Sequence, residues 1–509
     1  MLEKNQNVLI ANRGEIAVRI ARAAKSLGLN PISIFASADS DSLHTKLTYK
    51  ALELTGYDSD PVSAYLDIEQ IVNLAIENEC QFVHPGYGFL SENSEFAAKC
   101  TAEGINFIGP SSKILELFGD KVRARNLAQS LSIPTIPGSK ETIDSVESAK
   151  ATALEVGYPI MLKASAGGGG RGMRAVQTEE EMVTAFERCS SEAKSSFGDE
   201  SLFIEKLIER PRHIEIQILA DQLGHTMHLF ERDCSVQERN QKVIEIAPAP
   251  NLDEKLLDKL YADAKKLVTE AGYTNAGTVE FLVNPESDEY YFIECNPRIQ
   301  VEHTVTEEIT GIDLVEAQFR ISFGETLESM SINEAQEKKR PSSFAVQTRV
   351  ISKGNGSLNS YKEPSGPGVR VDSAAYPGLT PPPFFDPLLA KLICTSNSSG
   401  SFSSALSRTL VSLQEFHIDG IPTNLSTLRK ILESQELIKG DARTDLLSKE
   451  GLATPDALNT NSPALDLFEK NSPAKYARTK ANANSVVSNH PAIEVDPNHQ
   501  AIECPMAGS

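Results

Sequence analysis

The first part of the chain alternates short apolar runs with longer segments in which apolar residues recur at helical spacing. Residues 8–11 and 32–35 are apolar runs of strand length, typical of buried strands. Between them, apolar residues from Ile16 to Leu27 lie on one face of a helix that is expected to end at Gly28. The alternation continues with a predicted helix over residues 65–77 and strand ends at 82–83 and 107–108. The pattern predicts a doubly wound α/β unit.

The turn after the first predicted strand limits which cofactor this unit can bind. It reads Asn12-Arg13-Gly14-Glu15 and lacks the Gly-x-Gly-x-x-Gly pattern of dinucleotide-binding proteins. A nicotinamide cofactor is therefore not expected. Glycine and proline cluster in residues 84–93, where another strand should end. This segment is either a structural loop or one wall of a ligand crevice at the carboxyl edge of the sheet.

Farther along the chain, the apolar pattern changes to one that is rich in strands. Ile214, Ile216 and Ile218 alternate with polar residues within 212–219, which predicts a strand. Residues 277–283 and 290–295 predict a β-hairpin. Glu280 lies in its first strand, Glu294 lies in its second strand, and Asn296 follows directly after the second strand. Residues 343–448 form a third region, with Ser- and Gly-rich turns. Beyond about residue 450 the composition shifts to Asn, Ala, Ser and Pro, which is typical of a linker.

Four consecutive glycines, residues 167–170, separate predicted strands that end at Lys163 and begin at Met173. Without a Cβ, the backbone N–H groups of such a run can wrap an anion, and Lys163 adds positive charge. No Gly-Lys-Ser/Thr ending follows, which excludes a P-loop. A helix is expected from about Thr178, which has capping-box spacing to Glu181. The run predicts a flexible hairpin that folds over a nucleotide, with a plain surface turn as the alternative.

Composition and charge narrow the class of ligand and the compartment. The chain has 509 residues, enough for two to four domains, and its 49 basic and 70 acidic residues give a net charge of −21. Such a charge argues against a general nucleic-acid or anionic-membrane surface, so a polyanionic ligand needs a local basic site. Seven scattered cysteines without a C-x-x-C pair fit reduced thiols in the cytoplasm. No signal core or 18-residue apolar span is present.

Three oxygen-bearing side chains on the predicted hairpin are candidate metal ligands. Glu294 and Asn296 are two residues apart and share one face of their strand, and Glu280 lies in the middle of the partner strand. Carboxylates that converge there repel one another unless a cation neutralises them, and Mg²⁺ prefers oxygen ligands. The alternative is a set of solvated acids on an exposed strand. The flanking apolar residues favour partial burial and hence the metal site.

The segment after the hairpin offers groups that suit a small oxyanion. Arg298 has a planar fork that fits bicarbonate or a carboxylate, and Glu302, four residues on, is a candidate base in the same pocket. Lys242 is a candidate second cation. Each residue alone is more often part of a surface ion pair, so the indication comes from their order and spacing.

Together these motifs resemble those of the biotin carboxylases, the ATP-grasp components of acyl-CoA, pyruvate and urea carboxylases. The resemblance covers roughly residues 5–445 and includes the glycine run and the segments 10–16, 84–93, 119–121, 231–235, 241–242, 292–294 and 296–303. It implies an α/β (α+β overall) chain of three domains. These are a Rossmann-like N-terminal domain (1–118), an ATP-grasp domain (119–335) with a mobile glycine-rich lid (about 135–205), and a biotin carboxylase C-terminal domain (336–448), followed by a linker (449–509).

The resemblance also implies which residues bind ATP and metal. Lys121 and Lys163 are expected to contact the phosphates, beneath a loop that contains Gly169 and Gly170. The nucleotide is further expected to contact Glu205, Lys206, Leu207, His213, Gln237 and Asn240. Mg²⁺ or Mn²⁺, as two ions, is expected at Glu280, Glu294 and Asn296.

For the second half of the site, the resemblance implies that Lys242, Arg298, Gln300 and Val301 bind bicarbonate and that Glu302 deprotonates it. Arg349 is expected to stabilise the enolate form of biotin. The implied reaction forms carboxyphosphate and ADP from bicarbonate and ATP. Breakdown of carboxyphosphate then delivers CO₂ to N1′ of biotin, with the released phosphate as the base.

The implied partners are a biotinyl carrier domain, a carboxyltransferase and a second copy of the chain in a homodimer. Residues 502–508 resemble the opening strand of a carrier domain, so the chain is expected to be a fragment of a longer carboxylase. One alternative is another ATP-grasp ligase, for instance one that makes carbamoyl phosphate. A second is a non-catalytic subunit, which the presence of Lys163, Glu294, Arg298 and Glu302 argues against.

The chain departs from the usual family pattern at three places. Asn240 replaces a histidine and Glu238 replaces an arginine, so we expect an altered affinity for the nucleotide. Ala166 replaces the first glycine of the usual run. The acidic Ala-Glu-Asp-Pro stretch that usually follows the biotin-side arginine is absent, and Arg349 leads instead into the different segment 350–357.

Overall fold

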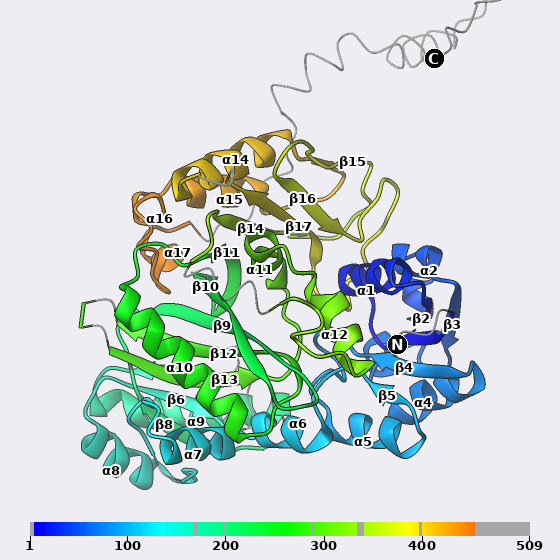
Figure 1. The fold of residues 1–509 in the computed structure, drawn as a ribbon. Coiled ribbons are helices and arrows are strands. Elements are labelled where there is room, and N and C mark those ends of the chain that lie inside the picture. The colour runs from blue at the N-terminus through cyan, green and yellow to red at the C-terminus, as the bar shows by residue number, and fades with distance from the viewer. Residues whose placement is uncertain are drawn as a thin grey trace, which may run out of the picture. The chain divides into compact units, whose positions relative to one another are not determined.

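The structure is a computed structural model that describes residues 5–139, 141–165, 172–197, 199–284, 286–287, 289–332, 340–396 and 400–452 (Figure 1). The glycine run with Ala166, Gly169 and Gly170, and the expected linker beyond residue 452, lie outside the described residues. None of the described helices is both long enough and apolar enough to cross a membrane.

The N-terminal unit is a parallel five-stranded sheet with helices around it, which confirms the predicted doubly wound α/β unit (blue in Figure 1). The strand order is β3-β2-β1-β4-β5. The strands are β1 (Asn7–Ile10), β2 (Asn30–Ala36), β3 (Lys50–Leu54), β4 (Cys80–His84) and β5 (Asn106–Phe107). The helices are α1 (Gly14–Ser26), η1 (Ser37–Asp39), α2 (Leu43–Leu47), α3 (Pro61–Ala64), α4 (Ile68–Glu77), α5 (Ser94–Ala102) and α6 (Ser112–Gly119).

The strand order reverses at the neighbours β1 and β4, so a crevice opens at their carboxyl ends. There, the side-chain amide of Asn12 donates to the carbonyls of Pro85 (2.6 Å) and Tyr87 (2.9 Å). Gly86 has a φ of +65°, and a Cβ on it would come within 3.0 Å of Asn12 and Ile16. Glycine at this position therefore lets the segment 84–93 pack against the turn after β1.

His84, at the end of β4, makes the stability of this unit pH-dependent. Burial lowers the pKa of His84 to about 3, and its Nδ1 accepts from the N–H of Gly86 at 3.1 Å. The unfolded chain therefore binds a proton at higher pH than the folded chain does, and the folded state loses stability as pH falls from about 6.5 toward 3. One pH unit below 6.5, this loss should be about 1.4 kcal/mol. In urea unfolding at several pH values, His84→Gln should show a shallower decline than the unaltered chain. Equal slopes would contradict the assignment.

A three-stranded sheet and two helices form the predicted hairpin region. The strands, in the order β7-β6-β8, are β6 (Ile160–Ala164), β7 (Met173–Val176) and β8 (Leu202–Lys206). The helices are α8 (Val146–Val156) and α9 (Met182–Phe197), with α7 (Lys121–Ser130) preceding them and the short η2 (Glu179–Glu181) before α9. This sheet and these helices enclose their own apolar core.

The predicted capping box at Thr178 is wrong. The Thr178 side chain makes no cap hydrogen bond, and the Glu181 carboxylate accepts from the backbone N–H of Gln177 at 2.9 Å. Residues 179–181 form a 3₁₀ turn, so α9 begins at Met182, four residues after Thr178. The carboxylate therefore bonds an N–H one residue before the expected cap, and a 3₁₀ turn of the kind common at helix starts precedes α9.

An eight-stranded sheet, in the order β13-β12-β9-β10-β11-β14-β17-β16, connects the ATP-grasp segment to the C-terminal region. Its strands are β9 (Arg212–Ala220), β10 (Thr226–Glu238), β11 (Gln241–Ala247), β12 (Asn275–Asn284), β13 (Glu289–Asn296), β14 (Ala345–Ile351), β16 (Val369–Ser373) and β17 (Leu388–Thr395). The alternating isoleucines of β9 pack in a core with α10 (Glu254–Glu270). The polar residues between them are also buried, so both faces of β9 are covered.

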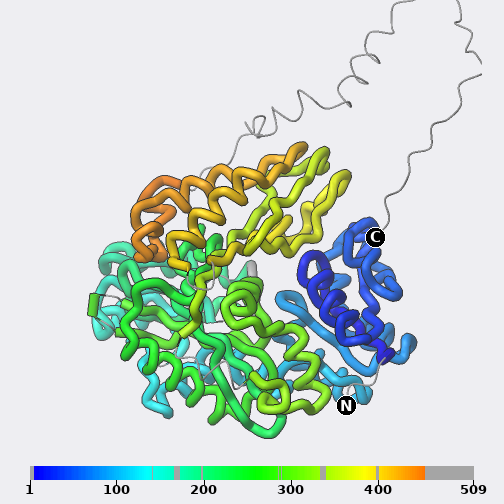
Figure 2. Tube along the Cα trace, turned by 45° about the horizontal axis from the view of Figure 1, so that its top comes forward, coloured from blue at the N-terminus to red at the C-terminus, as the bar shows by residue number. Residues whose placement is uncertain are grey.

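The rest of the C-terminal region packs on this sheet (yellow to orange in Figure 1). It comprises the pair β15 (Ser360–Lys362) and β18 (His417–Asp419) and the helices α14 (Phe402–Glu415), α15 (Leu425–Leu432), α16 (Gln435–Ile438) and α17 (Leu446–Lys449). Two more helices, α11 (His303–Thr310) and α12 (Leu314–Ser322), follow β13. The buried Lys391 of β17 pairs with Glu15 of α1 at 2.8 Å, which joins the N-terminal unit (dark blue in Figure 2) to this region.

Candidate active site

A cleft of about 2010 Å³ lies between the N-terminal unit, the hairpin region and the eight-stranded sheet. Every predicted site residue that the structure describes lines it. They are Lys121, Lys163, Glu205, Lys206, Leu207, His213, Gln237, Asn240, Lys242, Glu280, Glu294, Asn296, Arg298, Gln300, Val301, Glu302 and Arg349. Gly169 and Gly170 are outside the described residues. Residues as far apart in the sequence as Lys121 and Arg349 thus line the same cleft.

A row of charged residues crosses four adjacent strands, from the buried interior at Arg232 and Glu215 to the cleft at Glu280 and Glu294. Arg232 of β10 lies opposite Glu215 of β9, which lies opposite Glu280 of β12, which in turn lies opposite Glu294 of β13. Residues directly opposite on neighbouring strands point to the same face, and like charges there repel. The row of three carboxylates therefore needs positive charge beside it.

Lys242 of β11 supplies that charge at the buried centre of the site. Its Nζ donates to Glu215 Oε2 (2.5 Å), Glu280 Oε1 (2.9 Å) and Glu302 Oε1 (2.7 Å). Burial opposes the charged form of Lys242, but these three carboxylates hold its pKa well above the ordinary value. Burial likewise opposes ionisation of Glu280, while Lys242 and His213 hold the pKa of Glu280 well below its ordinary value. Lys242 and Glu280 therefore both remain charged at neutral pH.

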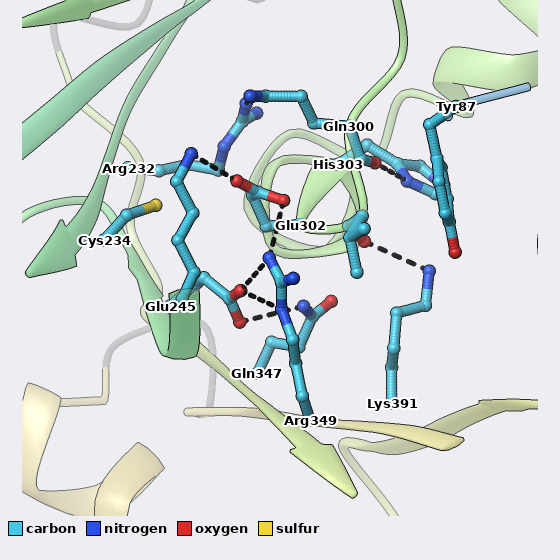
Figure 3. A network of polar contacts seen from close by, with 12 residues as sticks. Tyr87, Arg232, Cys234, Glu245, Gln300, Glu302, His303, Gln347, Arg349 and Lys391 are labelled. Carbon is cyan, nitrogen blue, oxygen red and sulfur yellow. Dashed lines mark hydrogen bonds and ion pairs between the residues drawn. The ribbon is translucent and has the colours of Figure 1, made fainter. Parts of the chain in front are cut away.

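Glu302 lies between two cations at the start of α11 (Figure 3). Besides Lys242, it accepts from Nη2 of Arg349 at 3.1 Å, and Nε of Arg349 donates to Glu245 at 2.6 Å. Burial would raise the pKa of Glu302, but Lys242 and Arg349 hold that pKa far below its ordinary value. Glu245 differs, because burial raises its pKa despite the arginine. Arg349 is thus held between two buried carboxyl groups.

Arg232 is a buried support for the same site, and the sequence analysis did not identify it. Its guanidinium donates to Gln217 (2.6 Å) and Gln300 (2.9 Å) and forms an ion pair with Glu215. Gln300 in turn donates to Glu280 at 2.7 Å. The sequence analysis also missed the roles of Glu215 and Glu245. The strict alternation of polar and branched apolar residues along β9 was a possible signal for Glu215, since a strand buried on both faces must satisfy its polar side.

The predicted metal ligands lie together and fit a hard cation. Glu280 and Glu294 face each other, and the Asn296 amide lies 2.8 Å from Glu280 and 3.4 Å from Glu294. Glu294 keeps a third of its side chain exposed to the cleft, with Lys121 at 3.8 Å. Glu280 and Asn296 are buried, and Nδ2 of Asn296 faces both carboxylates, but carboxylate and amide oxygens are the donors that Mg²⁺ prefers. Glu280 differs from the expectation, because Lys242 already neutralises it.

The predicted nucleotide-binding residues lie in the hairpin region, at the start of β9 and around the β10–β11 turn. Lys163 forms an ion pair with Glu205, and Lys206 donates to the carbonyls of Gly157 and Tyr158, both at 2.9 Å. Gln237 lies 2.8 Å from Nδ1 of His213, whose Nε2 lies 2.6 Å from Glu280. Asn240 occupies the turn with a φ of +64°, a left-handed conformation that asparagine adopts more readily than β-branched residues do.

The segment 84–93 forms one wall of this cleft. Nε of Arg298 donates to Glu92 of that segment at 2.6 Å, and Nη2 lies 3.3 Å from Asn296 Oδ1. Tyr87 and Phe89 also line the cleft. Of the two interpretations left open by the sequence, the structure supports the crevice wall.

Comparison with known families agrees with this arrangement. The profile "Biotin carboxylase, N-terminal domain" matches residues 4–115, and "Biotin carboxylase C-terminal domain" matches residues 347–449. Between them, "Carbamoyl-phosphate synthase L chain, ATP binding domain" matches residues 120–330. The central profile alone fits both ATP-grasp alternatives, whereas the flanking two favour a biotin carboxylase.

Similar curated proteins include biotin carboxylase 2 of Bacillus subtilis, which is 44% identical over 449 residues. That alignment covers 87% of this chain and 99% of the relative. Pyruvate carboxylase of the same organism is 44% identical over 466 residues. This chain aligns over 89% of its length with that enzyme and spans 40% of it.

Similar solved structures include the biotin carboxylase domain dimer of Hydrogenobacter thermophilus 2-oxoglutarate carboxylase, in complex with MgADP, ADP and bicarbonate. Its TM-score is 0.84 at 41% identity, over 88% of this chain and 98% of that one. The biotin carboxylase–β-γ-ATP complex of Campylobacter jejuni has a TM-score of 0.82 at 38% identity, over 87% of this chain and 98% of that one. With the three-domain layout and the site described above, these findings show that the chain belongs to the biotin carboxylase family of ATP-grasp ligases.

Proposed function

We propose that this chain carboxylates biotin, using ATP and bicarbonate. The observation that carries the proposal is the buried junction at which Lys242 and Arg349 both contact Glu302, in the same cleft as Arg298 and the lysines predicted to bind phosphate. A base between two cations, with a third cation nearby, suits the capture and deprotonation of a small oxyanion.

Bicarbonate enters beside Lys242 and Arg298 as an anion and competes with Glu302 for their positive charge. When Lys242 also donates to bicarbonate, it stabilises the Glu302 carboxylate less. The pKa of Glu302 then rises from its low value in the free protein, and Glu302 becomes a better base. The proton moves from the bicarbonate hydroxyl to a Glu302 carboxylate oxygen. The resulting oxyanion attacks the γ-phosphorus of ATP, the bond to the bridging oxygen breaks, and ADP leaves.

In this proposal Lys121 and Lys163, which line the cleft, hold the phosphates during the transfer. Phosphoryl transfer depends mainly on positioning and on neutralisation of charge. When bound at Glu280, Glu294 and Asn296, Mg²⁺ supplies further neutralisation of the phosphate oxygens. We extend the proposal to two ions and to Mn²⁺ as a substitute, because the donor set is entirely oxygen.

Biotin then occupies the Arg349 side of the cleft. The guanidinium stabilises the negative charge on the ureido oxygen of the enolate, and N1′ attacks the CO₂ released from carboxyphosphate while phosphate takes the N1′ proton. The proposed partners are a biotinyl carrier domain that delivers biotin and a carboxyltransferase that consumes carboxybiotin. We also propose a homodimer and a cytoplasmic setting.

ADP release by the purified chain tests this function. With Mg²⁺-ATP and bicarbonate, we expect slow turnover that free biotin stimulates. Biotin should stimulate it because the second step consumes the CO₂ released from carboxyphosphate. The control omits bicarbonate and should show almost no ADP. Bicarbonate-dependent turnover without biotin stimulation would contradict the second step, and ATP binding without turnover would support the non-catalytic alternative.

A further inference from the structure

Two of the chain's departures from the usual family pattern touch each other in the structure. Glu238, at the end of β10, accepts a hydrogen bond from Nζ of Lys353 at 3.1 Å, and the two side chains are 24% and 23% exposed. Lys353 belongs to the segment that follows Arg349 and β14. The ion pair therefore joins the β10–β11 turn to the C-terminal region at the edge of the cleft.

The pair lies where backbone pairing between β11 and β14 has ended. The last paired residues on this side are Ile244 and Thr348. Lys242 and Arg349, the two cations on Glu302, both lie beyond that point. Continuing the register outward would place Lys353 opposite Arg239, next to Glu238. Beyond the last backbone pair of β11 and β14, the Glu238–Lys353 ion pair thus links the start of β11, which carries Lys242, to the end of β14, which carries Arg349.

Each end of the link is fixed to rigid backbone. The N–H of Lys353 donates to the carbonyl of Pro422 at 2.8 Å, and the adjacent Ser352 N–H donates to that of Pro387 at 2.9 Å. Glu238 is paired with Gln241 across a turn in which Arg239 and Asn240 both have positive φ, at +52° and +64°. A half-buried charge pair between two such anchors transmits a displacement of one strand end to the other.

We propose that the Glu238–Lys353 ion pair is a positioning contact that sets the separation of Lys242 and Arg349 and thereby the affinity of the cleft for biotin. The proposal rests on the proposed function. Neither residue contacts the reacting atoms. They act through the turn that carries Lys242 and through the strand end that carries Arg349.

The test is a double-mutant cycle with Glu238→Gln, Lys353→Met and both together. Each single variant should raise the KM for biotin by about threefold to tenfold, since a link of this kind contributes about 1 kcal/mol. The kcat should change less than KM does. The double variant should be no worse than either single variant, and the exchange Glu238→Lys with Lys353→Glu should restore KM to within about twofold. Additive losses, or a KM unchanged in the single variants, would overturn the proposal.

A matched control is Arg320–Glu325, an ion pair at 2.7 Å with 34% and 26% exposure that does not line the cleft. Arg320→Met and Glu325→Gln should leave the KM for biotin unaltered. A second readout does not depend on turnover. Amide exchange at residues 241–243 should rise in Lys353→Met, and exchange at 350–352 should rise in Glu238→Gln, with recovery in the charge-exchanged variant. If the unaltered chain shows no biotin-stimulated turnover, the proposed function fails, and the exchange data alone decide whether the link exists.

Discussion

Lys242→Met is expected to abolish turnover and to lower the free energy of unfolding by about 3–5 kcal/mol, because breaking a buried ion pair leaves uncompensated charge. Lys242 is the shared hydrogen-bond donor of Glu215, Glu280 and Glu302. Without it, carboxylates from three elements face one another in a buried space. Urea unfolding and bicarbonate-dependent ADP release measure the two effects.

The pH dependence of this variant provides a specific check. In the unaltered chain, Lys242 holds the pKa values of Glu280 and Glu302 below their ordinary range. Carboxyls with lowered pKa values stabilise the fold above the ordinary pKa of about 4.5, and this contribution is lost as pH falls through the folded-state values. In Lys242→Met the same carboxyls gain protons more easily, so the deficit in stability should shrink as pH falls from neutral toward 5. A deficit that is independent of pH would indicate lost packing and not lost charge.

Lys242→Arg is the matched control for the catalytic part. Arginine keeps the charge, so most of the stability should return. Its fork is planar and larger than an ammonium group, so it cannot reproduce three convergent contacts at 2.5–2.9 Å. We therefore expect a stable protein with a raised KM for bicarbonate. An unchanged bicarbonate dependence would remove Lys242 from the bicarbonate site.

Glu302→Gln is expected to bind ATP normally and to lose about 10²–10⁴ in bicarbonate-dependent ADP release, the usual contribution of a general base. The amide is nearly isosteric with the carboxylate, but Lys242 and Arg349 donate to different oxygens of Glu302, so the single amide oxygen keeps only one of these two hydrogen bonds (Figure 3). Calorimetric titration with Mg²⁺-ATP and a single-turnover assay separate binding from chemistry.

Glu302→Asp is the matched control, since it keeps the base but withdraws it from the two cations. It should fall between the unaltered chain and Glu302→Gln in rate. Normal turnover in Glu302→Gln would rule out Glu302 as the base. Loss of ATP binding in the same variant would instead point to a collapse of the cleft.

Local patterns were sufficient for most of the fold. Apolar periodicity predicted the strand–helix alternation of the N-terminal unit and the hairpin of β12 and β13, because each depends on residues close in sequence. A helical turn begins directly after Thr178 and leads into α9, as predicted, but the capping box does not form, since the spacing of Thr and Glu does not determine which N–H group the carboxylate will bond. Likewise, the sequence did not reveal that one sheet continues from β13 to β16.

For the candidate site too, the sequence predicted some of the residues and only the structure revealed the others. The residues that line the cleft followed from the family motifs, and the oxygen-rich metal set followed from strand periodicity. The supporting residues Arg232, Glu215 and Glu245 did not, because their importance lies in partners on other strands. Although Arg232 lies within the family segment 231–235, that segment did not indicate which residues Arg232 contacts.

By itself, the sequence determined the family of this protein, the order of its elements and the residue types in its cleft. Only the tertiary structure decided how those residues are paired. The register of four strands aligned Arg232, Glu215, Glu280 and Glu294 in one row, and the pairing of β10 with β11 brought Lys242 within reach of three carboxylates. Register depends on contacts between distant segments, and a shift of one residue would turn each side chain to the opposite face of the sheet.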